Sequence, residues 1–281
     1  MASPDTFEKE IVASVVFAAG KGSRMTGYTG NKTLLPLISR GGLFEGERPL
    51  LIGVLSNLPP GPRCLVVNHC ADAVRQATAG LGCTYLYQEV TNGTGGALLA
   101  AHPFLESTQA GEVIITMGDV PLIRHSTYAR LRGGLRRHPM VVLAFSPRDR
   151  ARYGMLEMDG ERAMRIVEWK YWREFSADEQ ARLRYCNAGV YAVRRDILLP
   201  YLERMASTPH RVEKERDGKL TVIEEYFLTD LVEWMSGDGL TVGVVEASEE
   251  EVMGVDTPEA LRTAQDAYSR RSKEIESAHV K

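Results

Sequence analysis

Short apolar, β-branched runs alternate with amphipathic segments through the first half of the chain. Strand-like runs lie at residues 11–19, 63–68, 83–89, 112–119 and 140–146, and helix-like runs lie at 49–58, 70–80, 94–105 and 126–138. This alternation is typical of βαβ units, in which helices cover a parallel sheet. We therefore predict an α/β fold with a Rossmann-like, mostly parallel sheet.

From about residue 147 the pattern changes to closely spaced strands and short helices. Residues 153–170 resemble two strands around Asp159-Gly160, a dipeptide that favours a hairpin turn. Ser176 and Glu179 have the spacing of a capping box at the start of a short helix. We therefore predict an inserted α+β segment over residues 147–235. Further expected elements are a strand and helix over 185–205, a helix over 224–235, a strand over 240–248 and a long terminal helix over 256–281.

The composition is that of an ordinary globular enzyme, with 44% hydrophobic and 25% charged residues. The formal net charge of −3 offers no broad basic surface, so we expect small-molecule partners and no nucleic acid. The polar N-terminus is unlike a signal peptide, and no apolar run reaches the roughly 18 residues of a membrane span. The four cysteines form no CxxC pair, as expected for reduced thiols. These features predict a cytoplasmic protein with no membrane partner.

A glycine-rich loop follows the first predicted strand. It reads AAGKGSRM from Ala18 to Met25, and Lys32 follows seven residues later. The loop is neither a P-loop nor a G-x-G-x-x-G fingerprint, because Met25 occupies the sixth position of the latter. Its glycines still let backbone N–H groups surround an anion, and Arg24 and Lys32 can neutralise a triphosphate. The alternative is a tight turn with solvated basic residues.

This loop resembles the signature of the sugar-nucleotide pyrophosphorylases, L-A-A-G-x-G-T-R-M followed by P-K. The most similar member is the uridylyltransferase domain of the bifunctional N-acetylglucosamine-1-phosphate enzymes. Phe17, Ser23 and Asn31 replace the leucine, threonine and proline of the signature, and one extra residue precedes Lys32. The resemblance implies nucleotide binding by Ala18, Ala19, Gly20 and Gly22, and catalytic roles for Arg24 and Lys32.

A second motif, QEVTNGTGGA, resembles the base-reading pattern Q-x4-G-T-[AG]-H-A of this family. It assigns Gln88, Gly93 and Thr94 to the nucleotide, and Gly96 stands in place of the histidine. A glutamine amide can both donate to and accept from the edge of uracil or thymine.

Two aspartates fall in motifs that imply a metal site. Asp119 follows a predicted strand in TMGDVPLI, which is similar to the family's G-D-x-P-L, and open α/β sheets bind ligands at the carboxyl ends of their strands. VMGVDTPEAL resembles G-V-N-x-x-x-x-L, with Asp256 in place of asparagine. Carboxylate oxygens suit Mg²⁺, which shares the phosphates of a nucleotide. The resemblance thus implies a magnesium cofactor at Asp119 and Asp256.

Three later motifs resemble the sugar-binding half of the family, namely YGML…RIVEWK, YCNAGVY and EEYFLTDL. Met117 and Phe227 stand where the most similar relative has tyrosines. Carboxylates and amides suit sugar hydroxyls, because a buried polar group rejects an analogue that lacks its partner. The residues assigned to the sugar are Gly154, Glu168, Asn187, Glu225 and Thr229.

The resemblance spans about residues 12–262 and implies a domain organisation. A nucleotidyltransferase domain is expected over 1–256, with a nucleotide half at about 12–146 and a sugar-binding segment at about 147–235. A C-terminal helix is expected over 257–281, without a left-handed β-helix acetyltransferase domain. The implied reaction is Mg-dependent transfer of a nucleotidyl group from UTP to N-acetylglucosamine 1-phosphate.

Two alternatives remain open at this level. Met117, Phe227 and Asp256 allow another nucleoside triphosphate, or another sugar or polyol phosphate. Gly96, Asn31 and the lengthened loop allow a catalytically inactive regulatory module that binds nucleotide sugars. The terminal helix can be solvated or can dock a partner, and the oligomeric state is open.

Overall fold

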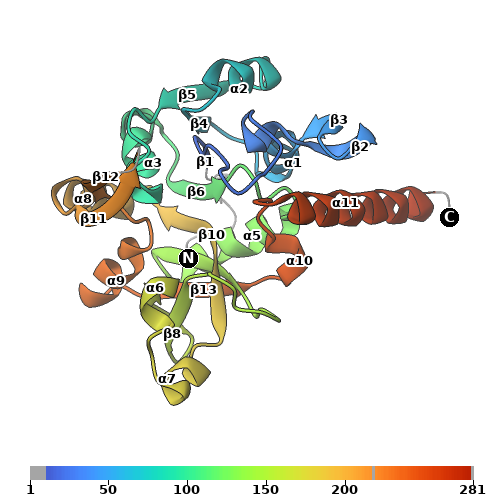
Figure 1. Ribbon diagram of the computed structural model, residues 1–281. Helices are drawn as coiled ribbons and strands as arrows, with labels where there is room; N and C mark the ends of the chain where they lie inside the picture. Colours follow the sequence, from blue (N-terminus) through green and yellow to red (C-terminus); the bar gives the residue numbers. More distant parts are fainter. Residues whose placement is uncertain (1–10, 217–218, 280–281) are drawn as a thin grey trace, which may run out of the picture.

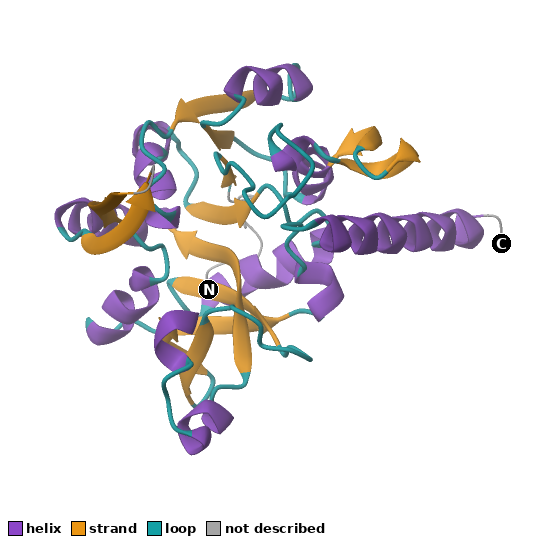
Figure 2. Ribbon diagram, viewed as in Figure 1, coloured by secondary structure: helices purple, strands orange, loops and turns teal. Residues whose placement is uncertain are grey.

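The computed structural model describes residues 11–216 and 219–279, and its centre is a nine-stranded mixed sheet (Figures 1 and 2). The strand order is β5-β4-β1-β6-β10-β7-β13-β9-β8. Their bounds are β1 Val12–Ala18, β4 Arg63–Val67, β5 Cys83–Tyr87, β6 Glu112–Met117, β7 Met140–Phe145, β8 Met155–Asp159, β9 Arg162–Val167, β10 Tyr185–Arg194 and β13 Val242–Glu246. The first ten residues of the predicted nucleotidyltransferase domain lie outside the described residues.

Parallel pairing is concentrated in the first half of the chain. β1 pairs in parallel with β4 and β6, and β4 pairs in parallel with β5. β10 instead runs antiparallel to β6, β7 and β8. The predicted α/β class with an added α+β segment is therefore confirmed.

Helices cover both faces of this sheet (Figure 1). They are α1 Leu50–Asn57, α2 Ala71–Ala77, α3 Thr94–Ala100, α4 His102–Ser107, α5 His125–Gly133, α6 Trp169–Trp172, α7 Ala177–Arg182, α8 Arg195–Ser207, α9 Asp230–Gly237, α10 Glu249–Val252 and α11 Pro258–His279, with short 3₁₀ turns at Lys32–Leu34 and Gly134–Arg136. No helix in the described ranges combines the length and apolar character needed to cross a membrane.

β1 is buried along its whole length. Successive side chains of a strand point to opposite faces. Val15 and Phe17 accordingly pack in a cluster with α3, α4 and α8, whereas Val12 and Val16 pack in a second cluster with α1 and α5. The uninterrupted apolar run in the sequence follows from this burial on both sides.

Most predicted elements are present, and two predicted helices differ from the structure. The capping box is confirmed: the Ser176 hydroxyl accepts from the Glu179 N–H, and the Glu179 carboxylate accepts from the Ser176 N–H. The predicted helix over 94–105 is broken at Ala101, because Pro103 is tolerated only in a first helical turn. The predicted helix over 224–235 is wrong in its first half, because a strand continues to Glu225 and α9 begins only at Asp230.

That strand forms one of two hairpins that the sequence did not reveal. β11 (His210–Arg216) pairs with β12 (Lys219–Glu225), and β2 (Pro36–Gly42) pairs with β3 (Glu45–Pro49). Both hairpins stand apart from the main sheet (Figure 2). Their strands are rich in charged and glycine residues, so they lack the apolar alternation by which strands are recognised.

The first half of α11 packs against the β2–β3 hairpin, and the helix then extends past the body of the protein (Figure 1). Leu261, Ala264 and Ala267 are buried in a cluster with Leu35 and Leu37. The buried Gln265 amide donates to the carbonyl oxygens of Pro36 (2.8 Å) and Leu43 (3.0 Å). The start of this helix is therefore part of a core and is not a solvated tail.

Replacing Gln265 with leucine should destabilise the protein. The substitution removes both hydrogen bonds and leaves two partly buried carbonyls unpaired, so the free energy of unfolding should fall by about 1–3 kcal/mol. Urea denaturation followed by circular dichroism measures the change. Asp266→Ala, at an exposed neighbouring position, is the matched control. Equal stability of the two variants would contradict the packing role of Gln265.

Candidate active site

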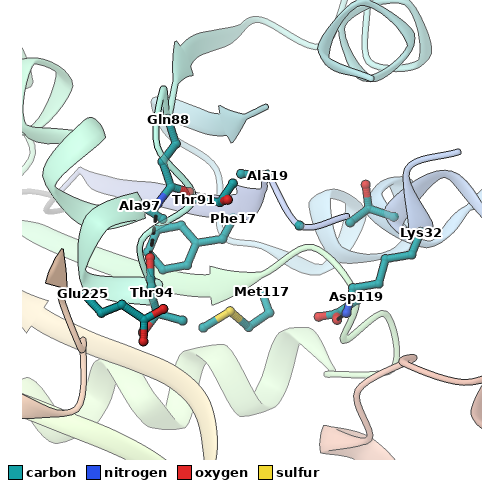
Figure 3. A pocket seen from close by; sticks show the side chains of 13 residues that line it. Phe17, Ala19, Lys32, Gln88, Thr91, Thr94, Ala97, Met117, Asp119 and Glu225 are labelled. Carbon is teal, nitrogen blue, oxygen red and sulfur yellow. Dashed lines mark hydrogen bonds and ion pairs between the residues drawn. The ribbon is translucent and has the colours of Figure 1, made fainter. Parts of the chain in front are cut away.

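The carboxyl ends of β1 and β6 meet at a cleft of about 320 Å³, within the size range of small-molecule sites (Figure 3). The two ends are held together by a hydrogen bond from the Gly118 N–H to the Phe17 carbonyl (2.9 Å). Eight residues predicted from motifs line this cleft, and they come from segments far apart in the sequence. They are Ala19, Gly20, Lys32, Gln88, Gly93, Thr94, Asp119 and Glu225.

The two glycines of the loop serve different purposes. Gly22 has a φ of +63°, and a Cβ there would lie 3.1 Å from the Lys32 Cβ, so a side chain would press on Lys32. A Cβ at Gly20 would meet no atom within 4 Å. Since Gly20 lines the cleft, this open space lets a ligand approach the backbone closely. Ala18, the last residue of β1, is itself buried beneath the loop.

Asn31 anchors the far end of the loop. Its buried amide donates to the carbonyl oxygens of Ala18 and His69, both at 2.8 Å. Its oxygen accepts from the backbone N–H (3.0 Å) and hydroxyl (2.7 Å) of Thr33. All four hydrogen-bonding positions of the amide are used, and they tie the ends of β1 and β4 to the turn that carries Lys32. Asn31 is thus a structural anchor for the lengthened loop.

Lys32 lies between the two predicted metal ligands. Its ammonium forms ion pairs with both Asp119 and Asp256, and Figure 3 shows it meeting Asp119 at one end of the cleft. Asp256 is brought there by the Val255 N–H, which donates to the Asp119 carbonyl (2.9 Å). Burial alone would lower the pKa of Lys32, but the two carboxylates outweigh it and raise that pKa. Lys32 therefore stays cationic at neutral pH.

Arg24 joins the same cluster from the solvent side. Its guanidinium lies 2.8 Å from the second oxygen of Asp256, and 68% of its side chain is exposed. Lys32 and Arg24 together balance the two carboxylates, so an incoming polyphosphate meets cations already in place.

The same carboxylates are suited to a divalent metal. In the described part of the chain, no group of three or more His, Cys, Asp or Glu side chains gathers at a common point. A pair of aspartates nevertheless suits Mg²⁺, which keeps several waters and takes further oxygens from phosphates. The cation that lies between the two carboxylates here, the Lys32 ammonium, shows that their negative charges converge.

The opposite end of the cleft carries Gln88, which is only 5% exposed. The loop that follows is bonded to the segment after β12. A Cβ at Gly93 would lie 2.3 Å from the Tyr226 carbonyl, which accepts from the Gly95 N–H (2.8 Å). The Thr94 hydroxyl accepts from the Leu228 N–H (3.2 Å). These contacts hold the predicted base-reading loop against the chain that carries Glu225.

Four of the five predicted sugar-binding residues form a second, adjacent cluster. The Gly154 carbonyl accepts from the Asn187 N–H (2.9 Å), and a Cβ at Gly154 would lie 3.6 Å from the Glu168 carboxylate. The Thr229 hydroxyl donates to that carboxylate (3.1 Å). Burial raises the pKa of Glu168, which the Thr229 hydrogen bond partly offsets. Glu225 lies elsewhere, in the lining of the nucleotide cleft.

Motif reasoning assigned no binding role to five further lining residues: Phe17, Thr33, Thr91, Ala97 and Met117. Most are small or apolar and carry no chemical signature. Met117 connects the two clusters, since a Cβ at Gly189, within strand β10, would lie 3.4 Å from its methyl group. The motif resemblance already singles out Met117 as a position where the most similar relative has tyrosine.

The sequence is similar to known proteins along most of its length. Residues 14–214 match the family model described as MobA-like NTP transferase domain. The bifunctional protein GlmU of Ruegeria sp. (strain TM1040) is 31% identical over 266 residues, and that of Paracoccus denitrificans (strain Pd 1222) is 35% identical over 270 residues. Each alignment covers 93% of this chain and 54% of the relative. The chain thus spans about half the length of these curated relatives.

Solved structures show the same fold at low sequence identity. The uridine diphosphate N-acetylglucosamine pyrophosphorylase of Trypanosoma brucei superimposes with a TM-score of 0.70 at 14% identity, covering 91% of this chain and 65% of that one. A CMP:2-keto-3-deoxy-manno-octonic acid synthetase complexed with CTP gives a TM-score of 0.63 at 16% identity, covering 93% and 99%. Nucleotidyltransferases of this type generally use a divalent metal. Because the family model matches well over half of the sequence, the chain belongs to the MobA-like NTP transferase family.

Proposed function

We propose that this chain transfers a uridylyl group from UTP to a sugar 1-phosphate, with N-acetylglucosamine 1-phosphate as the first candidate. The observation that carries the proposal is the cleft itself, which has Lys32 and Asp119 at one end and Gln88 at the other. One continuous cleft therefore contains charged groups that can bind a triphosphate and an amide that can bind a base. The motif resemblance to the uridylyltransferase domain of the N-acetylglucosamine-1-phosphate enzymes, and the fold shared with a uridine diphosphate N-acetylglucosamine pyrophosphorylase, favour uracil and N-acetylglucosamine as the base and sugar.

In the proposed reaction, an oxygen of the sugar phosphate attacks the α-phosphorus of the nucleotide. A new P–O bond forms, and the bond from the α-phosphorus to the bridging oxygen breaks, so that pyrophosphate leaves with the electron pair. The nucleophile is already an anion and requires no general base. Catalysis then rests on positioning and charge neutralisation.

The charged residues divide these tasks. Lys32 has a flexible four-carbon side chain, so its ammonium can turn from the carboxylates toward phosphate oxygens in the cleft. Arg24 neutralises charge from the exposed side. Asp119 and Asp256 would hold Mg²⁺, which when bound supplies charge neutralisation and orientation at the phosphates. In the adjacent cluster, Gly154, Glu168, Asn187 and Thr229 would orient the sugar, with Glu225 nearer the nucleotide.

Pyrophosphate release from a panel of nucleoside triphosphates and sugar 1-phosphates, with Mg²⁺ and with EDTA, tests the proposal. EDTA-sensitive release with UTP and N-acetylglucosamine 1-phosphate is the expected result. Release with a different pair would keep the mechanism and reassign the base or sugar. No release by a protein that still binds UTP would favour an inactive nucleotide-sugar-binding module.

Asp119→Asn should abolish most turnover and leave the fold intact. The substitution keeps the size of the side chain and does not touch the backbone carbonyl that accepts from the Val255 N–H. It removes only a carboxylate charge at the phosphate end of the cleft. We expect kcat to fall by about 10²-fold or more. The same substitution at the exposed Asp266 is the control. Wild-type turnover in Asp119→Asn would refute the metal assignment.

Arg24→Ala should lower kcat/KM without loss of stability, because the side chain is largely exposed. The loss of one group that stabilises transition-state charge costs about 3 kcal/mol, or roughly 10²- to 10³-fold. Arg75→Ala removes an exposed arginine that also pairs with an aspartate, and is the matched control. An effect of Arg24→Ala on the KM for the sugar phosphate alone would argue against its catalytic role.

A further inference from the structure

Gly96 and Asn92 are sterically coupled beside the base end of the cleft. A Cβ at Gly96 would lie 1.8 Å from the Asn92 side-chain oxygen and 3.1 Å from the Gln88 amide nitrogen. Gly96 lies within α3 and has no positive φ, so its backbone does not require glycine. Its missing side chain instead makes room for Asn92. Gly96 therefore replaces the family's histidine because any side chain at this position would collide with Asn92.

Asn92 and the backbone together orient the Gln88 amide. The Gln88 Nε2 donates to the Gly93 carbonyl (3.2 Å) and to the Asn92 Oδ1 (3.2 Å). A carbonyl can only accept, so the contact with Gly93 identifies which end of the amide is nitrogen. Both hydrogens of that nitrogen are then in use. Within the described residues, Gln88 Oε1 accepts no hydrogen bond, and it is the amide atom left for a ligand in the cleft.

We propose that Asn92 is a positioning residue that restricts Gln88 to accepting a hydrogen bond, and that the site thereby selects bases whose ring nitrogen carries a hydrogen. This inference rests on the proposed function, which places the nucleobase against Gln88. Asn92 does not line the cleft and acts only through Gln88.

The chemistry of the two pyrimidines explains the selection. Uracil presents N3–H, which can donate to Gln88 Oε1. Cytosine presents an unprotonated N3, whose lone pair would face the lone pairs of that oxygen. A free glutamine amide could rotate to donate instead, but here both hydrogens are held by Gly93 and Asn92. A buried group that meets an unsuitable partner discriminates strongly against it.

Equilibrium binding of UTP and of CTP, measured by calorimetry in the presence of Mg²⁺, tests the role of Asn92 independently of turnover. Wild-type protein should bind UTP more tightly than CTP. Asn92→Leu has a similar size and no acceptor, so one Nε2 hydrogen becomes available and the preference for UTP should fall by about tenfold. Asn92→Asp keeps an acceptor oxygen of the same shape and should retain the preference.

Gly96→Ala provides a second variant that leaves Asn92 in the sequence. Alanine is favoured over glycine in a helix, so the fold should persist while the new methyl group displaces Asn92 from Gln88. Its preference for UTP should fall like that of Asn92→Leu. An unchanged ratio in both variants, or equal binding of UTP and CTP by wild-type protein, would overturn the inference and leave the proposed reaction standing. Failure of wild-type protein to bind either nucleotide would overturn both.

Discussion

Parallel pairing of β1 with β4 and β6 is the constraint on which the cleft depends. Parallel strands bring their carboxyl ends to the same edge, so the loops after β1, β4 and β6 emerge side by side. Asn31 then bonds the ends of β1 and β4 to the turn that carries Lys32. These hydrogen bonds fix the position of the glycine loop relative to Asp119, which follows β6.

The two ends of the cleft are held by different kinds of interaction. At the phosphate end, Lys32 and Arg24 meet Asp119 and Asp256 in a compact group of opposite charges. At the opposite end, backbone contacts with Tyr226 and the hydrogen bonds of the Gln88 amide hold the loop in place. The proposed phosphate end thus offers cations and carboxylates that can pair with phosphates and a metal ion, while directional hydrogen bonds at the other end can distinguish bases.

Motif order predicted many of the residues that line the cleft, because charged and glycine residues carry local signatures. Asp119 and Gln88 both line the cleft as expected from their motifs. Gly96 could not be interpreted from the sequence, because its meaning depends on Asn92, whose side chain reaches it only once α3 has formed. The β11–β12 hairpin was missed for a related reason: its charged strands are stabilised by pairing with each other and show no apolar alternation.

The sequence by itself determined the α/β class, the glycine loop and the identity of the charged groups, since periodicity and residue chemistry are local properties of the chain. Only the tertiary structure decided that the Lys32 ammonium lies between the carboxylates of Asp119 and Asp256. Lys32 and Asp256 are 224 positions apart in the sequence. It also decided that Glu225 lines the nucleotide cleft while Glu168 lies in the adjacent cluster. Such distances depend on how distant segments pack, and no local pattern encodes them.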